Sequence, residues 1–170
     1  MRRNSLHYLP LQTCSLQALT HLDISDNKLT ELPNEIIQLT QLEELQVSDN
    51  ELKSLDCVLR LPRLRIIVAA RNMITNFGMS SSRSMSPGDE NNCEHKSPIT
   101  NVDLRHNRLK GSIILGNYEH LVSLDVSHNA VEVLVLSSLR GLRELYASHN
   151  AIQHMALHGA SLRILRAPFN

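Results

Sequence analysis

The sequence contains few aromatic residues and has no excess of either charge. Only 3% of its 170 residues are Phe, Trp or Tyr, and none is Trp. Seventeen Lys and Arg balance seventeen Asp and Glu, so the formal net charge is zero. This balance provides no electrostatic basis for binding nucleic acid or an anionic membrane. No apolar run approaches the ~20 residues that a membrane-spanning helix requires.

Cysteines and enzyme signatures are also scarce. Cys14, Cys57 and Cys93 are an odd number without a paired spacing, which favours a reducing, intracellular environment over a disulfide framework. No apolar segment follows the first residues, as it would in a secretory signal, so we expect a cytoplasmic location. The sequence has no Gly-x-Ser-x-Gly, no Gly-rich phosphate loop ending in Lys and no His-Glu-x-x-His. We therefore expect neither catalysis nor a cofactor.

What the sequence does contain is a recurring motif, seen clearly in the stretch from Leu19 to Leu29. It has the pattern Leu-x-x-Leu-x-Ile-x-x-Asn-x-Leu, which is the template of a leucine-rich repeat. Leu22 and Ile24 alternate as strand residues do and so point to one face. Asn27 follows where the chain must leave the strand. Its amide can both donate to and accept from backbone groups that the bend would otherwise leave unpaired.

The motif recurs along nearly the whole chain. Its asparagines are 20–23 residues apart except for one interval of 35, and an apolar residue follows five positions after each, with Ser112 as the exception. The sequence therefore predicts an α/β solenoid, a leucine-rich-repeat horseshoe with a parallel concave β-sheet and short helical, 3₁₀ or extended convex returns. The structural asparagine ladder would comprise Asn27, Asn50, Asn72, Asn107, Asn129 and Asn150.

The connections between strands are expected to differ along the chain. Pro33 can open a short helical or 3₁₀ turn in the return of its repeat. Later repeats shorten to 20–22 residues, and β-branched returns such as 133–139 favour an extended convex wall. The chain begins and ends within repeats, so we expect it to be a fragment of a longer protein.

The 35-residue interval predicts an insertion between two blocks of repeats, 1–77 and 99–170. Residues 78–98 contain six serines and two prolines and have few apolar residues, so we expect a disordered Ser-rich segment on the return side. The sheet could then continue past it. Ser84, Ser86 and Ser97 are candidate phosphorylation sites, although Ser-Pro pairs are common in any disordered insertion.

The concave face of the sheet is the candidate binding surface. Equivalent residues of neighbouring parallel strands should form columns about 4.8 Å apart, with charges of both signs and a small apolar patch, as in many protein-binding surfaces. An ordinary solvated sheet face would look similar. The candidate residues are Asp23, Glu44, Gln46, Ile66, Val68, Asp103, Arg105, Asp125, Glu144, Tyr146 and Arg166.

A further column precedes the asparagines and contains three histidines in adjacent repeats, His106, His128 and His149. Neutral imidazoles could bind zinc. However, evenly spaced ligands on a flat sheet do not converge tetrahedrally, and no carboxylate or cysteine of the column lies beside them. We therefore expect three stacked, partly exposed histidines and no metal site.

Less generic segments indicate a family. They are Leu61-Pro-Arg-Leu-Arg-Ile-Ile-Val-Ala-Ala-Arg-Asn72, Ile99-Thr-Asn-Val-Asp-Leu-Arg-His-Asn107, Leu145-Tyr-Ala-Ser-His-Asn150 and Ser161-Leu-Arg-Ile-Leu165. In this order they resemble the repeat region of the PH-domain leucine-rich repeat protein phosphatases. The resemblance implies a longer protein with a lipid-binding module and a metal-dependent Ser/Thr phosphatase domain that acts on kinases of the protein kinase B and C types. Neither domain has a counterpart in this sequence, so no catalytic residue is carried over.

The resulting functional expectation is a non-catalytic protein–protein interaction or scaffold segment. We expect protein partners, either a kinase substrate or a signalling adaptor, and neither nucleic acid nor a membrane span. Two alternatives remain open: an unrelated intracellular leucine-rich-repeat scaffold of small-GTPase signalling, and a truncated receptor ectodomain.

Overall fold

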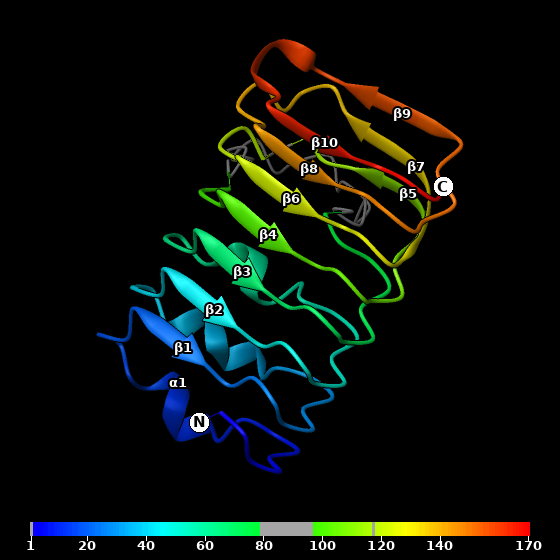
Figure 1. The fold of residues 1–170 in the computed structure, drawn as a ribbon. Coiled ribbons are helices and arrows are strands. Elements are labelled where there is room, and N and C mark those ends of the chain that lie inside the picture. Colours follow the sequence, from blue (N-terminus) through cyan, green and yellow to red (C-terminus); the bar gives the residue numbers. More distant parts are fainter. Residues whose placement is uncertain (1, 79–96, 117) are drawn as a thin grey trace, which may run out of the picture.

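A parallel seven-stranded sheet forms one side of the molecule (Figure 1). The computed structural model describes residues 2–78, 97–116 and 118–170. Each strand of the sheet has three residues, and the spatial order follows the chain. The strands are β1 (His21–Asp23), β2 (Glu44–Gln46), β3 (Ile66–Val68), β4 (Asn101–Asp103), β6 (Ser123–Asp125), β8 (Glu144–Tyr146) and β10 (Ile164–Arg166).

The middle residue of every strand of this sheet except β10 is buried, as alternation predicts, whereas Leu165 of β10 is 49% exposed. Leu45, Ile67 and Leu124 have no exposed surface, whereas the residues on either side of them are half-buried. The first and last residues of the strands therefore form two outward columns, and their pairing follows the predicted register without a shift. The first column is His21, Glu44, Ile66, Asn101, Ser123, Glu144 and Ile164; the second is Asp23, Gln46, Val68, Asp103, Asp125, Tyr146 and Arg166. We call these fourteen residues the concave face.

The sheet continues across the long interval, as predicted. Ile66 of β3 pairs with Asn101 of β4, and Val68 pairs with Asp103. The additional residues therefore enter the connection and leave the strand register intact. The predicted disorder of 78–98 falls almost wholly on residues 79–96, which lie outside the described residues.

The opposite side of the solenoid changes character along the chain, in agreement with the sequence analysis (Figure 1). The first returns contain the short helix α1 (Leu11–Cys14) and the 3₁₀ turns η1 (Asn34–Gln38) and η2 (Val58–Arg60). Pro33 immediately precedes η1, where its fixed φ suits a helical start. The later returns form a second parallel sheet of β5 (Lys110–Ile114), β7 (Ala130–Leu136) and β9 (His154–Leu157), followed by one more turn, η3 (Gly159–Ser161).

The pairing of β5 with β7 contains a bulge beside Ser112. Gly111 pairs with Val131 and Ser112 pairs with Val133, so Glu132 of β7 is the extra residue, and Ile113 pairs with Leu134. Ile113 is buried, whereas Ser112 is only half-buried. The apolar position of this repeat is therefore Ile113, one residue later than the spacing predicted. Gly111 beside the bulge has φ +68°, a conformation that glycine adopts readily.

The core is a single column of aliphatic side chains enclosed between the two walls. Cys14 belongs to it and Cys57 packs against its edge, both as free thiols. Phe77 and Tyr118 lie with their ring centroids 5.8 Å apart at the level of the long connection. Within the described residues, no helix is both long and apolar enough to cross a membrane.

Candidate functional site

The asparagines form a continuous hydrogen-bonded ladder along one edge of the sheet. In the repeat of Asn129, the amide nitrogen donates to the carbonyl oxygens of Leu104, Val126 and Ser127 at 2.9–3.2 Å. Its Oδ1 accepts the backbone N–H of Leu109 at 2.9 Å. The same pattern holds at Asn50, Asn72, Asn107 and Asn150. Each asparagine therefore joins its own turn to the preceding repeat, which assigns these residues a structural role.

The residue before each asparagine adopts a left-handed backbone conformation that sequence reasoning missed. These residues have φ of 53–60° although none of them is glycine. This conformation destabilises an L-residue, typically by about 1 kcal/mol or more. Other interactions of the turn must therefore offset that free energy. The asparagine bonds supply that compensation in every repeat. The residues are Arg3, Asp26, Asp49, Arg71, His106, His128, His149 and Phe169.

The three predicted histidines are brought together as a stack. The ring centroids of His106 and His128 are 4.1 Å apart, and those of His128 and His149 are 4.3 Å apart, with the ring planes within 15° of parallel. Phe169 continues the stack 4.7 Å from His149. Because the lone pairs of an imidazole lie in the ring plane, parallel stacked rings do not direct them at one common point. In the residues that the structure describes, no cluster of three or more His, Cys, Asp or Glu is arranged to hold a metal ion.

The stack predicts a pH dependence of stability. Desolvation lowers the pKa of His128 below its ordinary 6.5, and His106 and His149 lower it further, while Asp125 acts in the opposite direction. The unfolded chain therefore binds the proton more readily, and the contribution of His128 to stability is present above pH 6.5 and is lost as pH falls through the folded pKa. We expect the melting temperature to decrease between pH 7 and pH 5, and to decrease less in His128→Gln. His158→Gln, at an exposed histidine outside the stack, should leave the slope unchanged; equal slopes for both variants would contradict this assignment.

The concave face is more acidic than the chain as a whole. Five of its fourteen residues are carboxylates, namely Asp23, Glu44, Asp103, Asp125 and Glu144, and one, Arg166, is a permanent cation. The chain itself carries equal numbers of acidic and basic residues. The compensating positive charge therefore lies elsewhere on the molecule, and this face would attract a basic partner.

The residues that lie two positions after the strand ends form a third column, and part of it is buried. Ser25, Ala70 and Ser127 are 5%, 6% and 9% exposed. They follow the strand ends, where the chain already bends toward its left-handed turn. Ser48 and Ser148 of this column are half-buried, and Arg105 and Pro168 are exposed. The third column therefore adds accessible surface at some repeats and not at others.

Three aspartates at strand ends share one local geometry. The Oδ1 atoms of Asp23, Asp103 and Asp125 accept the backbone N–H two residues later, from Ser25, Arg105 and Ser127, at 2.9–3.1 Å. These bonds are Asx turns. The sequence signal for them is an aspartate at the last residue of the strand, two positions before Ser25, Arg105 or Ser127. They fix each carboxylate against its own strand and leave its second oxygen directed away from that bond.

Asp103 and Asp125 nevertheless differ in their charge balance. The Nε of Arg105 lies 3.2 Å from Oδ2 of Asp103. Burial raises the pKa of Asp103, Asp125 raises it further, and the N–H bond and charge of Arg105 counteract both. Asp125 has no ion-pair partner within 4.0 Å among the described residues. Of the two neighbouring carboxylates, Asp103 is therefore paired with Arg105 and Asp125 is not.

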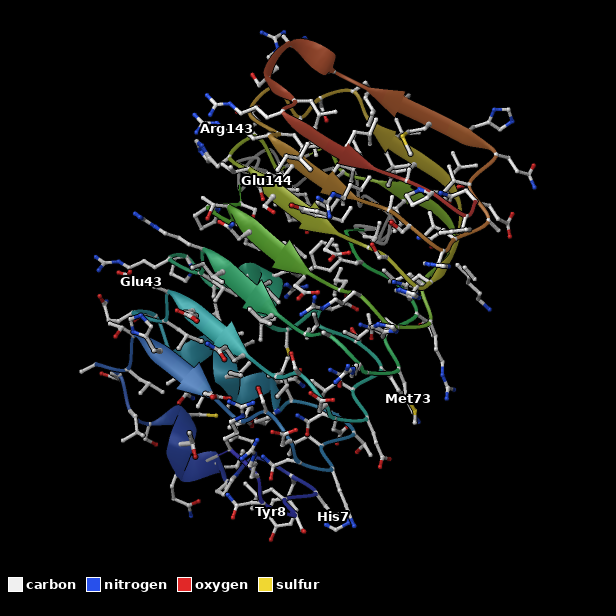
Figure 2. The ribbon with its side chains drawn as sticks, in the orientation of Figure 1. His7, Tyr8, Glu43, Met73, Arg143 and Glu144 are labelled. Atoms are coloured by element: carbon white, nitrogen blue, oxygen red, sulfur yellow. The ribbon has the colours of Figure 1, made fainter. Side chains whose placement is uncertain are left out.

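The other candidate residues of this face contact one another. Oε1 of Glu44 accepts from Nε2 of Gln46 at 2.6 Å, and Oε2 of Glu144 accepts from Oγ of Ser123 at 3.2 Å. The guanidinium of Arg166 lies 5.9 Å from the ring centroid of Tyr146, within range of a cation–π contact. Figure 2 places Glu144 at the start of β8, beside Arg143. These contacts hold the polar side chains in place without requiring a ligand.

A hollow of about 350 Å³ lies at the middle of the concave face. Ile66 and Val68 of β3 form its apolar end, and Asp103, Asp125 and Tyr146 form its polar end. Its volume is at the lower end of the range for ligand sites, about 300–1,000 Å³. The hollow thus has room for a few side chains of a partner.

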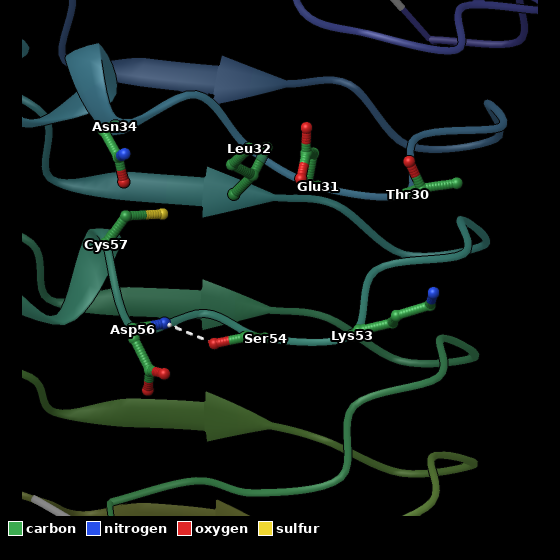
Figure 3. A pocket seen from close by; sticks show the side chains of 8 residues that line it. All are labelled: Thr30, Glu31, Leu32, Asn34, Lys53, Ser54, Asp56 and Cys57. Carbon is green, nitrogen blue, oxygen red and sulfur yellow. Dashed lines mark hydrogen bonds between the residues drawn. The ribbon is translucent and has the colours of Figure 1, made fainter. Parts of the chain in front are cut away.

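A second hollow, of about 310 Å³, lies on the return side between two repeats (Figure 3). Lys53, Asp56 and Cys57 line it, and the backbone N–H of Asp56 donates to Oγ of Ser54 at 3.0 Å. Burial raises the pKa of the Cys57 thiol, and Asp56 and Cys14 raise it further despite backbone hydrogen bonds that act in the opposite direction. A thiol that resists ionisation is a poor nucleophile, so Cys57 is not an activated thiol.

Of the three candidate phosphorylation sites, only Ser97 lies among the described residues. Ser84 and Ser86 lie outside the described residues. Ser97 is 9% exposed, and its Oγ accepts the backbone N–H of Ile99 at 3.4 Å. A kinase could reach this hydroxyl only after the segment had opened.

Comparisons with solved structures agree with the repeat architecture. A leucine-rich-repeat protein from Leptospira interrogans is 28% identical, with a TM-score of 0.71 over 88% of this chain and 36% of that one. Two structures at 21% identity show the fold alone. They are TLR13 in complex with ssRNA13, with a TM-score of 0.72 over 99% of this chain and 24% of that one, and the SOBIR1 ectodomain of Arabidopsis thaliana, with a TM-score of 0.58 over 81% and 73%.

Sequence comparison confirms the resemblance. The leucine rich repeat family model matches residues 2–52 and 17–74. The Protein phosphatase PHLPP-like protein of Drosophila melanogaster is 41% identical over 69 residues, which are 41% of this chain and 7% of that relative. The chain therefore has the leucine-rich-repeat fold, and its repeats are similar to a segment of a PHLPP-like protein phosphatase.

Proposed function

We propose that this chain is a non-catalytic protein-binding segment that uses its concave face to hold a signalling protein. The observation that carries the proposal is the continuous register of the sheet, which displays two columns of side chains on seven strands. A rigid backbone of this kind positions polar and apolar groups in advance and so lowers the ordering cost of binding. The mixture of carboxylates, amides, one aromatic ring and an aliphatic patch suits a protein surface.

The likeness to a PHLPP-like phosphatase supports a more specific role. We propose that the chain is the repeat segment of such an intracellular enzyme, and that it presents a kinase of the protein kinase B or C type to a phosphatase domain outside this sequence. A scaffold role is consistent with the structural use of the asparagines described above. The net acidity of the concave face gives this role a testable electrostatic component.

A direct binding measurement tests the proposal. Purified kinase of the B type would be titrated onto the immobilised 170-residue chain by surface plasmon resonance. We expect Asp125→Arg combined with Glu144→Arg to weaken binding at least tenfold, because charge reversal within a concave interface introduces repulsion. Asp125→Asn provides a milder change that keeps the Asx-turn acceptor.

The matched control reverses two charges on the return side, Glu31→Arg with Glu132→Arg, both at exposed positions. It should alter affinity less than about threefold, the scale of near-neutral interface positions. Melting curves would establish that each variant is folded. An equal loss of affinity in both double variants, or no binding by the unmodified chain, would refute the proposed role.

A further inference from the structure

Resting on the proposed protein-binding function, we infer that the hollow of the concave face recognises an extended partner segment with an aliphatic residue and, two positions later, an Arg or Lys. The aliphatic side chain packs on Ile66 and Val68. The basic side chain lies between Asp103 and Asp125, and the segment runs along the solenoid axis, across the strands.

The apolar end of the hollow is distinctive within the concave face. Ile66 and Val68 are the outward residues of β3, and both are half-buried in this isolated chain. The corresponding residues on β2 and β4 are Glu44 and Gln46, and Asn101 and Asp103. A partner aliphatic group would therefore find one apolar position flanked by polar ones, which fixes where along the sheet it packs.

The polar end of the hollow calls for a cation. Asp103 and Asp125 are register neighbours on β4 and β6, so they are adjacent members of one column, one strand apart. The Asx turns hold one oxygen of each carboxylate against its strand, and Arg105 contacts only Asp103. The raised pKa of Asp103, caused by burial and then by Asp125 as a like charge, supports a local excess of negative charge. A guanidinium or ammonium between the two would relieve it.

The separation of the two ends determines the spacing of the partner residues. Neighbouring strands lie about 4.8 Å apart, so a point midway between β4 and β6 is roughly 7 Å from β3. Residues i and i+2 of an extended chain point to the same side and are also separated by roughly 7 Å. Adjacent residues would point to opposite sides, so the pattern aliphatic-x-basic fits and aliphatic-basic does not.

The test uses synthetic peptides and the full 170-residue chain. The probe is Thr-Thr-Leu-Thr-Arg-Thr-Thr, whose β-branched residues favour an extended backbone. It would be titrated into ¹⁵N-labelled chain and followed by amide chemical shifts. We expect saturable shifts at β3, β4 and β6, with affinity that weakens as salt rises from 50 to 300 mM because screening shortens electrostatic range. Replacing Arg by Glu in the peptide should abolish binding, and Thr-Thr-Leu-Arg-Thr-Thr-Thr should bind at least fivefold more weakly.

Two isosteric variants make the comparison specific. Asp125→Asn should weaken the Arg peptide at least fivefold. Asp23→Asn changes the same type of strand-end aspartate, with its own Asx turn to Ser25, but lies on β1, outside the hollow. It should leave the affinity within twofold. Equal effects of the two variants, equal binding of the Glu peptide, or shifts confined to other strands would overturn the inference.

The outcome is separable from that of the kinase measurement. If the peptides show no preference while charge reversal on the concave face still abolishes kinase binding, the recognition pattern is wrong and the proposed function stands. If the Arg peptide binds as described while the kinase does not, the pattern stands and the kinase is not the partner.

Discussion

Asn129→Leu is expected to destabilise the chain by about 1–3 kcal/mol, the cost of leaving one buried polar group unpaired. The most important loss is Oδ1 of Asn129, which accepts the backbone N–H of Leu109 at 2.9 Å. Leu109 has no exposed surface, so water cannot replace this acceptor. The carbonyl groups that accept hydrogen bonds from the Asn129 side chain are less affected. Leu104 and Val126 also accept from the side-chain amides of Asn107 and Asn150.

Chemical denaturation followed by far-UV circular dichroism would measure this loss. The matched control is Asn101→Leu, the same substitution at an exposed position of the concave face. It should change the unfolding free energy by less than about 0.5 kcal/mol. Similar losses for the two variants would show that the asparagine ladder does not hold the turns.

Gly78→Ala is the second substitution for which we expect a large effect, roughly 2–4 kcal/mol. Gly78 has φ +72°, and a Cβ at this position would collide with Cδ2 of Leu115 and contact the ring of Tyr118. Leu115 is fully buried and Tyr118 is 7% exposed, so neither side chain can move into solvent. The substitution therefore combines a left-handed backbone penalty with overpacking.

Two other glycines separate these causes. Gly111 has φ +68° but open space around its Cβ position, so Gly111→Ala should cost only the backbone part, about 1 kcal/mol. Gly116 has neither a left-handed φ nor a neighbour within 4 Å, and its replacement by Ala should be nearly neutral. Thermal melts of the three variants should rank in this order, and any other order would contradict the steric explanation.

The sequence was sufficient for the strand register because two constraints coincide. Alternation fixes Leu22 and its equivalents toward the interior, and the spacing of the asparagines fixes where each repeat turns. Together they predicted both outward columns and the passage of the sheet across the long interval, since a connection can lengthen without altering the strands that it joins.

The turn conformation was not predictable in the same way. Residues as different as Asp26, Arg71 and Phe169 all have φ near +55 to +60°, so residue type gives no signal. The backbone is determined by the asparagine that follows and by the next repeat. Similarly, the pairing of Ile113 with Leu134 past the bulge at Glu132 is a contact between repeats and not a local preference.

For the candidate site, the members of the columns were predictable from the spacing, but their accessibility and pairing were not. Ser25 and Ser127, two residues after their strands, are buried because the chain bends inward there. The contrast between Asp103, which Arg105 contacts, and Asp125, which has no such partner in the described residues, depends on side-chain conformation. Such differences arise only after the fold has positioned the side chains.

The direct pairing of β3 with β4 has a practical consequence for engineering. Lengthening the connection between these strands should destabilise the fold only slightly, since doubling the length of a loop costs about 0.6 kcal/mol of closure entropy. A fluorescent reporter or an affinity tag could be spliced in between β3 and β4, whose register does not depend on the length of the chain that joins them. Such a graft would leave the presented array of side chains unaltered and would allow its occupancy to be followed in living cells.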